Sequence, residues 1–278
     1  MSAIRVLLPQ LQLPELDYMA PDGSCFVPGD LVNVPFRNKQ ITGVVTTVNI
    51  NSEFKNLREV SAKLDLHINS DVIDFLLKAA KYYMAPLGSM MKLMLPVELS
   101  EGRAPNPWEI VSLENAKLPI LSSDQLDALE QIKTSPNPSV LKGITGSGKT
   151  EVYFHYMAEM MAEGKQVLLM LPEIALGSQI IERFKDRFGF APAIWNSSIT
   201  KAKKRNLLRS IILGEVKIII GTRSALFLPY ANLGLIVVDE EHDASYKQDD
   251  GVMYNARDMA VMRGHITGTK VLLASATP

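Results

Sequence analysis

The chain has 278 residues, of which 47% are hydrophobic, and its formal net charge is −1. This length allows two domains with cores of their own, and the near-neutral charge excludes a uniformly basic surface, so nucleic acid could bind only local patches. A single cysteine, Cys25, excludes an internal disulfide and a cysteine-rich zinc site within these residues. Because no apolar run is long enough to span a membrane and no signal-peptide pattern is present, we expect a cytoplasmic protein.

Residues 1–100 have the pattern of a small β-rich domain. Apolar runs at 4–8, 30–36 and 41–48 predict strands. Ser70 is a candidate cap for a helix whose apolar stripe would pack against that sheet. Residues 101–120 contain one glycine and three prolines, which predicts a linker and therefore a domain boundary.

Residues 121–278 alternate between short apolar runs and helical segments. The runs lie at 140–141, 166–171, 216–220, 235–238 and 270–273, and the clearest helical segments at 151–162 and 178–188. Continuous rather than alternating apolar runs are typical of strands buried on both faces of a parallel sheet, so we predict an α/β fold. Polar clusters follow these runs, and because ligands of open α/β sheets bind beyond the carboxyl ends of the strands, we expect the clusters to share one edge.

The first cluster reads Gly-Ile-Thr-Gly-Ser-Gly-Lys-Thr at 143–150 and matches every fixed position of the phosphate-binding loop G-x-x-x-x-G-K-[ST]. Backbone N–H groups of such a loop, together with the start of the next helix, bind phosphate oxygens. We expect Lys149 to reach the β- and γ-phosphates and Thr150 to hold Mg²⁺. The nucleotide-binding residues predicted by the pattern are Gly143, Thr145, Gly146, Ser147, Gly148, Lys149 and Thr150. A glycine-rich turn before a helix is the structural alternative.

The cluster Asp239-Glu240-Glu241-His242 follows the run at 235–238, as a Walker B element does. Asp239 is the candidate Mg²⁺ ligand opposite Thr150, and Glu240 the candidate base for the attacking water. An acidic cap on a following helix is the alternative. His242 could couple the nucleotide site to nucleic acid or could simply be satisfied locally in its loop.

Two further predictions have structural alternatives. Gln125 could read the adenine edge, but its spacing from Ser122 also fits a capping box. Tyr246, Lys247, Tyr254 and Arg257 mix aromatic and basic side chains, which could stack on and hold a single strand, although ordinary core tyrosines would give the same pattern.

Several segments together resemble one known family, the PriA (primosomal protein N′) family of bacterial replication-restart helicases. The matching segments are the loop continued as Glu-Val-Tyr to 153, Leu-Pro-Glu-Ile at 171–174, Gly-Thr-Arg-Ser-Ala-Leu-Phe at 221–227, Asp-Glu-Glu-His-Asp-Ala-Ser-Tyr-Lys-Gln at 239–248, Tyr-Asn-Ala-Arg-Asp at 254–258, Ser-Ala-Thr-Pro at 275–278, and upstream Leu-Asp-Tyr at 16–18, Val-Pro-Phe at 34–36 and Tyr-Tyr at 82–83. The resemblance spans most of the chain.

The resemblance implies a superfamily 2 DNA helicase that moves 3′ to 5′, uses ATP and Mg²⁺, binds abandoned forks and helps to reload the replicative helicase. It implies a RecA-like first helicase lobe at 121–278 and, at 1–100, a domain that captures the 3′ end of a strand. The implied partners are forked and single-stranded DNA, primosome proteins and single-strand-binding protein, with no membrane.

The resemblance also implies roles for single residues. Asp17 would contact the terminal nucleotide, and Arg58 would be the basic residue of the same pocket. Arg37 stands where the family usually has glycine, which changes the shape of that pocket. The implied DNA contacts of the helicase lobe are Arg223, Tyr246, Lys247, Tyr254 and Arg257.

Two parts of the family pattern are missing from this sequence. The linker at 101–120 replaces most of a winged-helix domain, and the chain stops before a second motor lobe with its arginine finger and zinc-binding cysteines. Because an arginine finger contributes ~10³ to 10⁵ in turnover, we expect the chain alone to hydrolyse ATP weakly and not to translocate. The alternative is a fork-DNA-binding and ATP-binding fragment without helicase activity. A small-molecule kinase is less favoured, because the clusters at 221–223 and 275–277 would have no task in it.

Overall fold

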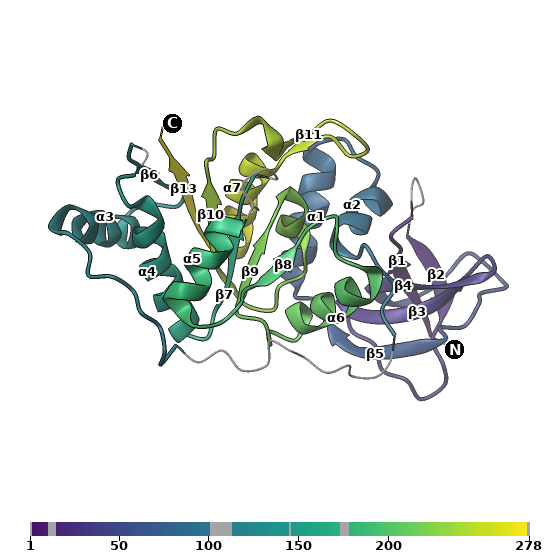
Figure 1. Cartoon of the computed structure of the whole chain (residues 1–278). Coiled ribbons are helices and arrows are strands. Elements are labelled where there is room, and N and C mark those ends of the chain that lie inside the picture. The colour runs from purple at the N-terminus through teal and green to yellow at the C-terminus, as the bar shows by residue number, and fades with distance from the viewer. Residues whose placement is uncertain (1, 11–14, 101–112, 145, 173–177, 277–278) are drawn as a thin grey trace. The chain divides into compact units, whose positions relative to one another are not determined.

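The computed structural model describes residues 2–10, 15–100, 113–144, 146–172 and 178–276. The chain divides into two compact units (Figure 1). The first comprises Met1–Pro105, Thr200–Leu213 and Phe227–Ala231, and the second comprises Asn106–Ile199, Gly214–Leu226 and Asn232–Pro278. No helix of the described residues is long and apolar enough to cross a membrane.

The first unit contains a five-stranded antiparallel sheet in the order β2-β1-β4-β3-β5. Its apolar faces enclose a core that includes Ile4, Val32 and Val45, none more than 1% exposed. The hairpin between β3 and β4 pairs Phe36 with Lys39, so Arg37 and Asn38 form the turn. The elements of this unit are β1 (Ala3–Leu7), β2 (Leu16–Met19), β3 (Asp30–Phe36), β4 (Lys39–Ile50), β5 (Ala62–His67), α1 (Ser70–Tyr82), α2 (Leu87–Met94) and α6 (Lys201–Ile212).

The second unit contains a six-stranded parallel sheet in the order β6-β13-β10-β7-β9-β8. Its strands are β6 (Ser139–Lys142), β7 (Gln166–Met170), β8 (Ala193–Trp195), β9 (Ile218–Gly221), β10 (Leu233–Asp239) and β13 (Lys270–Ser275), with the short pair β11 (Lys247–Gln248) and β12 (Tyr254–Asn255) forming a separate ribbon. Its helices are α3 (Ser123–Thr134), α4 (Lys149–Ala162), α5 (Ser178–Phe188) and α7 (Ala256–Thr267), with 3₁₀ turns at Arg223–Phe227 and Ala244–Tyr246.

Helices cover both faces of this parallel sheet. On one face, side chains of α3, α4 and α5 form a core with alternate strand residues such as Leu169 and Val237. The intervening strand residues, such as Leu168 and Ile236, are also fully buried, and α7 packs against β10 and β13 (Figure 1). Burial on both sides explains why these strands have continuous apolar runs, and the predicted α/β fold with a parallel sheet after a β-rich domain is confirmed.

The structure differs from the sequence prediction at several elements. Strands β2, β5 and β8 were not predicted. The cap of α1 is Asn69, which makes no side-chain capping bond, and Ser70 is instead the first helical residue. The expected capping box of α3 is present, with Ser122 Oγ accepting from the Gln125 backbone N–H and Gln125 Oε1 accepting from the Ser122 backbone N–H.

Candidate functional site

The phosphate-binding pattern lies between β6 and α4, at the carboxyl end of the sheet. Gly148 directly precedes α4 with φ +83°, a backbone conformation that favours glycine, and a Cβ here would also displace the Gln125 amide, whose Nε2 would lie 2.2 Å away. The N-terminus of α4 therefore opens onto the loop, as phosphate binding requires. Lys149 Nζ donates to the carbonyl oxygens of Gly143 (2.5 Å) and Ile144 (3.3 Å). Thr145 lies outside the described residues.

A cavity of about 240 Å³ adjoins this loop. Its polar wall includes Gln125, Ser147 and Lys149, and its apolar wall includes Leu141 and Val152. Gln125 Nε2 donates to the Ser147 carbonyl oxygen at 3.2 Å, so this side chain connects the start of α3 to the loop. The capping-box role of Gln125 is thus present, whereas adenine recognition stays a prediction.

Thr150 and Asp239 are joined through one tyrosine. The Tyr153 hydroxyl, fully buried on α4, donates to Asp239 Oδ2 at 3.0 Å and also hydrogen bonds with Thr150. The other Asp239 oxygen accepts from the Glu240 backbone N–H at 3.1 Å. Burial raises the pKa of Asp239 above its usual range, and the hydrogen bond from Tyr153 and the charge of Lys149 oppose that shift. The carboxyl end of β10 therefore lies at the start of α4.

The residues at this point suit Mg²⁺ rather than a softer metal. Thr150 and Asp239 present only oxygen atoms, and Mg²⁺ is typically held by one or two protein oxygens together with substrate phosphates and water. Among the residues that the structure describes, no cluster of three or more His, Cys, Asp or Glu side chains could hold a metal by itself. A magnesium ion here would accordingly take its remaining ligands from nucleotide phosphates and water.

Glu240 adopts a left-handed backbone conformation, with φ +46°. Its carbonyl oxygen accepts from the Asp243 N–H at 2.8 Å, and the neighbouring Glu241 N–H donates to the Ala274 carbonyl oxygen on β13 at 3.1 Å. These contacts stabilise a backbone conformation that a glutamate otherwise disfavours. The turn places the Glu240 side chain next to Asp239 and leaves it partly exposed.

The residues after Glu240 connect β10 to neighbouring segments. His242 Nδ1 lies 2.9 Å from Ser275 Oγ at the end of β13 and 3.7 Å from Glu240 Oε2. Glu241, with a side chain only 6% exposed, forms an ion pair with Arg257 at 3.1 Å. His242 is therefore satisfied locally, and its coupling of nucleotide to nucleic acid stays a prediction.

Arg223, which follows β9, holds the loop after β10. Its Nε donates to Gln248 Oε1 at 3.1 Å, and its NH1 donates to the carbonyl oxygens of Ser245 (2.8 Å) and Lys247 (3.3 Å). Lys247 is exposed, and Arg257 is 39% exposed in its side chain. The polar clusters after β9 and β10 therefore meet at one edge of the sheet.

The two tyrosines predicted to stack on bases are core residues. Tyr246 is 1% exposed and Tyr254 is 2% exposed, so neither ring presents a free face to a strand in this structure. The Tyr246 hydroxyl contacts the carbonyl oxygens of Met170 (3.0 Å) and Asp239 (2.6 Å). The structure thus corrects the stacking prediction in favour of the alternative, core tyrosines, because burial leaves neither ring accessible to a base.

A separate pocket of about 390 Å³ lies in the first unit, and we call it the Asp17 pocket. It brings together the two residues assigned to the strand end, Asp17 and Arg58, with Arg37 between them in sequence. The lining residues are Leu16, Asp17, Tyr18, Pro35, Phe36, Arg37, Phe54, Asn56, Leu57 and Arg58. Arg58 NH1 donates to the Arg37 carbonyl oxygen at 3.1 Å, and the exposed ring of Phe54 (71%) is available for contact with a base.

Asp17 is held by two residues that the sequence did not single out. Arg5 Nε donates to its Oδ1 at 2.9 Å, and Ser52 Oγ donates to its Oδ2 at 2.8 Å. The hydrogen bond from Arg5 lowers the pKa of Asp17, burial opposes this, and Ser52 adds to the lowering. Arg5 could have been found only from strand pairing, since it lies opposite Asp17 across β1 and β2. Tyr153 could have been found from its helical spacing of three residues after Thr150.

Comparisons with known proteins were made for the whole chain. A sequence model described as DEAD/DEAH box helicase matches residues 122–278, and one described as 3′DNA-binding domain (3′BD) matches residues 5–96. The chain is 51% identical over its whole length to the replication restart protein PriA of Rickettsia conorii, and 38% identical over 95% of its length to that of Helicobacter pylori. It spans 43% and 41% of the length of these two relatives.

Solved structures with a similar fold cover about half of the chain. RecG bound to a three-way DNA junction is 26% identical, with a TM-score of 0.44, over 58% of this chain and 22% of that one. The Hef helicase domain of Pyrococcus furiosus is 20% identical, with a TM-score of 0.44, over 56% of this chain and 32% of that one.

Proposed function

The chain belongs to the DEAD/DEAH box helicase family, and on this premise we propose that it carries the first motor lobe and the strand-end-binding domain of a replication-restart DNA helicase. The helicase moves 3′ to 5′ with ATP hydrolysis. Residues 121–278 form the lobe, residues 1–100 bind the 3′ end of a strand at a stalled fork, and residues 101–120 link them. The observation that carries the proposal is the Tyr153 hydroxyl, which brings Thr150 of the phosphate loop to Asp239 of the acidic cluster.

In the proposed nucleotide site, each group has a distinct task. Backbone N–H groups of the loop, from Gly143 to Gly148, bind the phosphates, and Lys149 exchanges its present carbonyl partners for the β- and γ-phosphates. Thr150 and Asp239 hold Mg²⁺, which would neutralise charge developing on the phosphates. Glu240 orients and deprotonates the attacking water, and Gln125 contacts the base from the adjoining cavity.

The proposed DNA contacts fall into two groups. In the first unit, Asp17 and Arg58 hold the terminal nucleotide in the Asp17 pocket. In the second unit, Arg223, Lys247 and Arg257 hold backbone phosphates beside the loop after β10. All three are cationic, and sequence-independent strand binding depends mainly on such contacts.

The proposed partners follow from this role. Forked and single-stranded DNA would bind directly, and primosome proteins and single-strand-binding protein would be recruited at the same forks. Since the two relatives compared above are bacterial, a helicase of this kind would work in the cytoplasm.

A second candidate function is an ATP- and fork-binding module that does not hydrolyse ATP rapidly. The left-handed conformation of Glu240 is compatible with both candidates. Steady-state phosphate release with and without forked DNA separates them. Slow release that forked DNA stimulates supports the first motor lobe, and release at the same low rate with and without DNA supports the module.

The core of the proposal is tested by separating nucleotide binding from DNA binding. Lys149→Ala should abolish binding of a fluorescent ATP analogue and leave binding of a 3′-ended oligonucleotide unchanged, whereas Asp17→Ala should do the reverse. Lys185→Ala, an exposed lysine on α5, is the charge-matched control. ATP binding by the Lys149→Ala variant at wild-type affinity would contradict the proposed site.

A further inference from the structure

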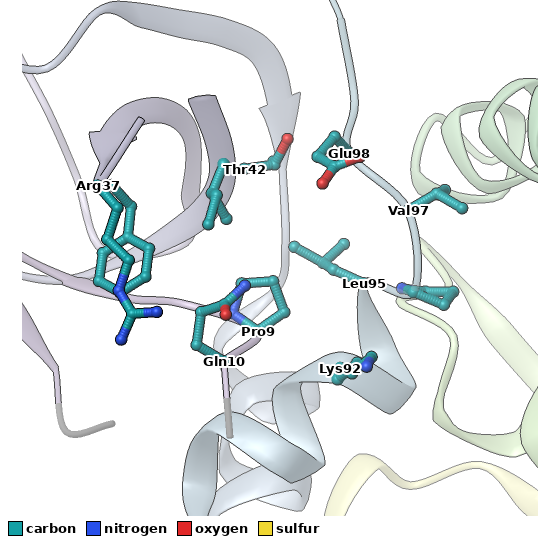
Figure 2. A pocket seen from close by; sticks show the side chains of 11 residues that line it. Pro9, Gln10, Arg37, Thr42, Lys92, Leu95, Val97 and Glu98 are labelled. Atoms are coloured by element: carbon teal, nitrogen blue, oxygen red, sulfur yellow. The ribbon is translucent and has the colours of Figure 1, made fainter. Parts of the chain in front are cut away.

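The turn between β3 and β4 separates two cavities of the first unit. One is the Asp17 pocket, and the other, of about 440 Å³, we call the Lys92 cavity (Figure 2). Phe36 and Arg37 line both cavities. The remaining lining residues of the Lys92 cavity are Pro9, Gln10, Ile41, Thr42, Lys92, Leu95, Pro96, Val97 and Glu98. Phe36 and Arg37 therefore belong to the walls of both cavities.

One wall of the Lys92 cavity, the segment around Glu98, is held by hydrogen bonds, of which the one to Thr42 is buried. The Leu99 N–H donates to Thr42 Oγ1 at 2.8 Å, and Asn33 Nδ2 donates to the Leu99 carbonyl oxygen at 3.2 Å. Arg205 Nε donates to the Glu98 carbonyl oxygen at 2.9 Å from α6. Thr42 is only 1% exposed, so its hydrogen bond with Leu99 is shielded from water. The cavity is thus a formed feature of this unit.

The charges of the Lys92 cavity suit an anionic chain. Arg37 and Lys92 are exposed cations, and among the described residues neither forms an ion pair. Figure 2 shows Arg37 at the left of the cavity, Lys92 at its lower right and Glu98 at its upper right, with Gln10 between the two cations in this view. The cavity therefore offers one cation at the β3–β4 turn and a second on α2.

Arg37 occupies a backbone conformation that suits glycine. Its φ is +52°, which side chains with a Cβ rarely adopt, and its guanidinium carbon lies 5.4 Å from the centre of the Phe36 ring. A glycine at this turn would remove the strain but also the cation. Backbone strain of this kind often occurs at functional residues, and Arg37 lines both cavities.

We infer that a single DNA strand continues from the Asp17 pocket past Arg37 into the Lys92 cavity, where Arg37 and Lys92 bind successive backbone phosphates. This inference rests on the proposed function in one respect, that the terminal nucleotide occupies the Asp17 pocket. The Gln10 amide and the Phe36 ring lie beside this path and can contact the preceding bases.

The test compares a short with a longer strand. Thymidine oligonucleotides of two and six nucleotides, with a free 3′ hydroxyl and a 5′ fluorophore, are titrated with the whole chain by anisotropy. Lys92→Ala should weaken binding of the longer strand about threefold or more and leave the dinucleotide unchanged. It should also reduce the slope of log affinity against log salt by about 0.7, the loss of one phosphate contact on a single strand.

Two further variants make the test sharper. Arg37→Gly, which relieves the turn, should keep or raise the melting temperature and weaken binding of both strands. Lys78→Ala removes an exposed lysine of α1 that lines neither cavity, and it should change neither affinity nor salt slope.

The outcomes separate this inference from the proposed function. If the wild-type chain binds the longer strand but Lys92→Ala behaves as Lys78→Ala does, the strand does not enter the Lys92 cavity and the inference is overturned, while the proposed function stands. If the wild-type chain binds neither strand, both are overturned.

Discussion

Removing the hydroxyl of Tyr153 is the sharpest perturbation of the nucleotide site, because that hydroxyl contacts both Thr150 and Asp239. Tyr153→Phe keeps the ring and its packing inside the core. It leaves Asp239 Oδ2 without the partner that now lies at 3.0 Å. The variant therefore isolates one hydrogen bond.

The expected size of the effect follows from that geometry. A hydrogen bond to a charged group contributes ~1.5 to 3 kcal/mol, and Tyr153 is fully buried, so the free energy of unfolding should fall by an amount in that range. The melting temperature should fall by about 2 to 4 °C for each kcal/mol lost in a domain of 150 to 250 residues. Because Tyr153 orients a proposed metal ligand, the Mg²⁺-dependent part of ATP binding should weaken ~10- to 100-fold.

The assay measures binding of a fluorescent ATP analogue in excess EDTA and then across a Mg²⁺ titration. Tyr156→Phe is the matched control, since it removes the same atom from another buried tyrosine of the same helix. The charges near Tyr156 are Glu159, Glu163 and Lys133, away from the nucleotide site. A wild-type Mg²⁺ dependence in Tyr153→Phe would refute the reasoning that Thr150 and Asp239 form one magnesium site.

Three other predictions concern catalysis, loop order and pH. Glu240→Gln should keep Mg²⁺-ATP binding and lower DNA-stimulated phosphate release ~10²- to 10⁴-fold, and release near the wild-type rate would remove Glu240 as the base. Arg223→Lys loses the paired donors that hold Gln248 and two carbonyl oxygens, so amide hydrogen exchange should rise across residues 244–248; unchanged exchange there would contradict the contact. Burial raises the pKa of Asp30, but hydrogen bonds from Lys63, the Val27 N–H and His67 outweigh it and the pKa lies below its usual value. The resulting stability should be complete above about pH 4, the unfolded pKa, and should be lost as the pH falls through the lower folded value. Melting temperatures from pH 5 to 2 test this, with Asp30→Asn expected to show a flatter profile.

The parts of the fold that could be predicted are those specified by local patterns. The runs at 166–171 and 235–238 are continuous because β7 and β10 are buried on both faces, and this signal is visible without any partner. Strand β5 alternates instead, with Leu64 and Leu66 buried between exposed neighbours. It has no continuous apolar run and was not predicted, although alternation also indicates a strand. Strand β8 has only three residues, too few for either pattern.

In the candidate sites too, features that depend on short sequence spacings could be predicted, and contacts between distant residues could not. The phosphate loop and the Ser122–Gln125 capping box depend on short spacings and could be predicted from them. The burial of Tyr246 could not, because its hydroxyl contacts the Met170 carbonyl oxygen, 76 positions earlier in the chain. The Arg5–Asp17 pair likewise requires the register of two strands. Contacts of this kind exist only once the chain has folded.

The position of the Tyr246 phenol has a mechanical consequence. Its single proton is shared between two carbonyl oxygens, those of Met170 and Asp239, at the ends of adjacent strands. The same residue ends the 3₁₀ turn whose Ser245 carbonyl oxygen is held by Arg223. A pull on that turn from outside would be felt at the peptide of Asp239 without passing through any side chain of the nucleotide site. A displacement of the 3₁₀ turn would thus reach the backbone of a proposed magnesium ligand through a single hydrogen bond.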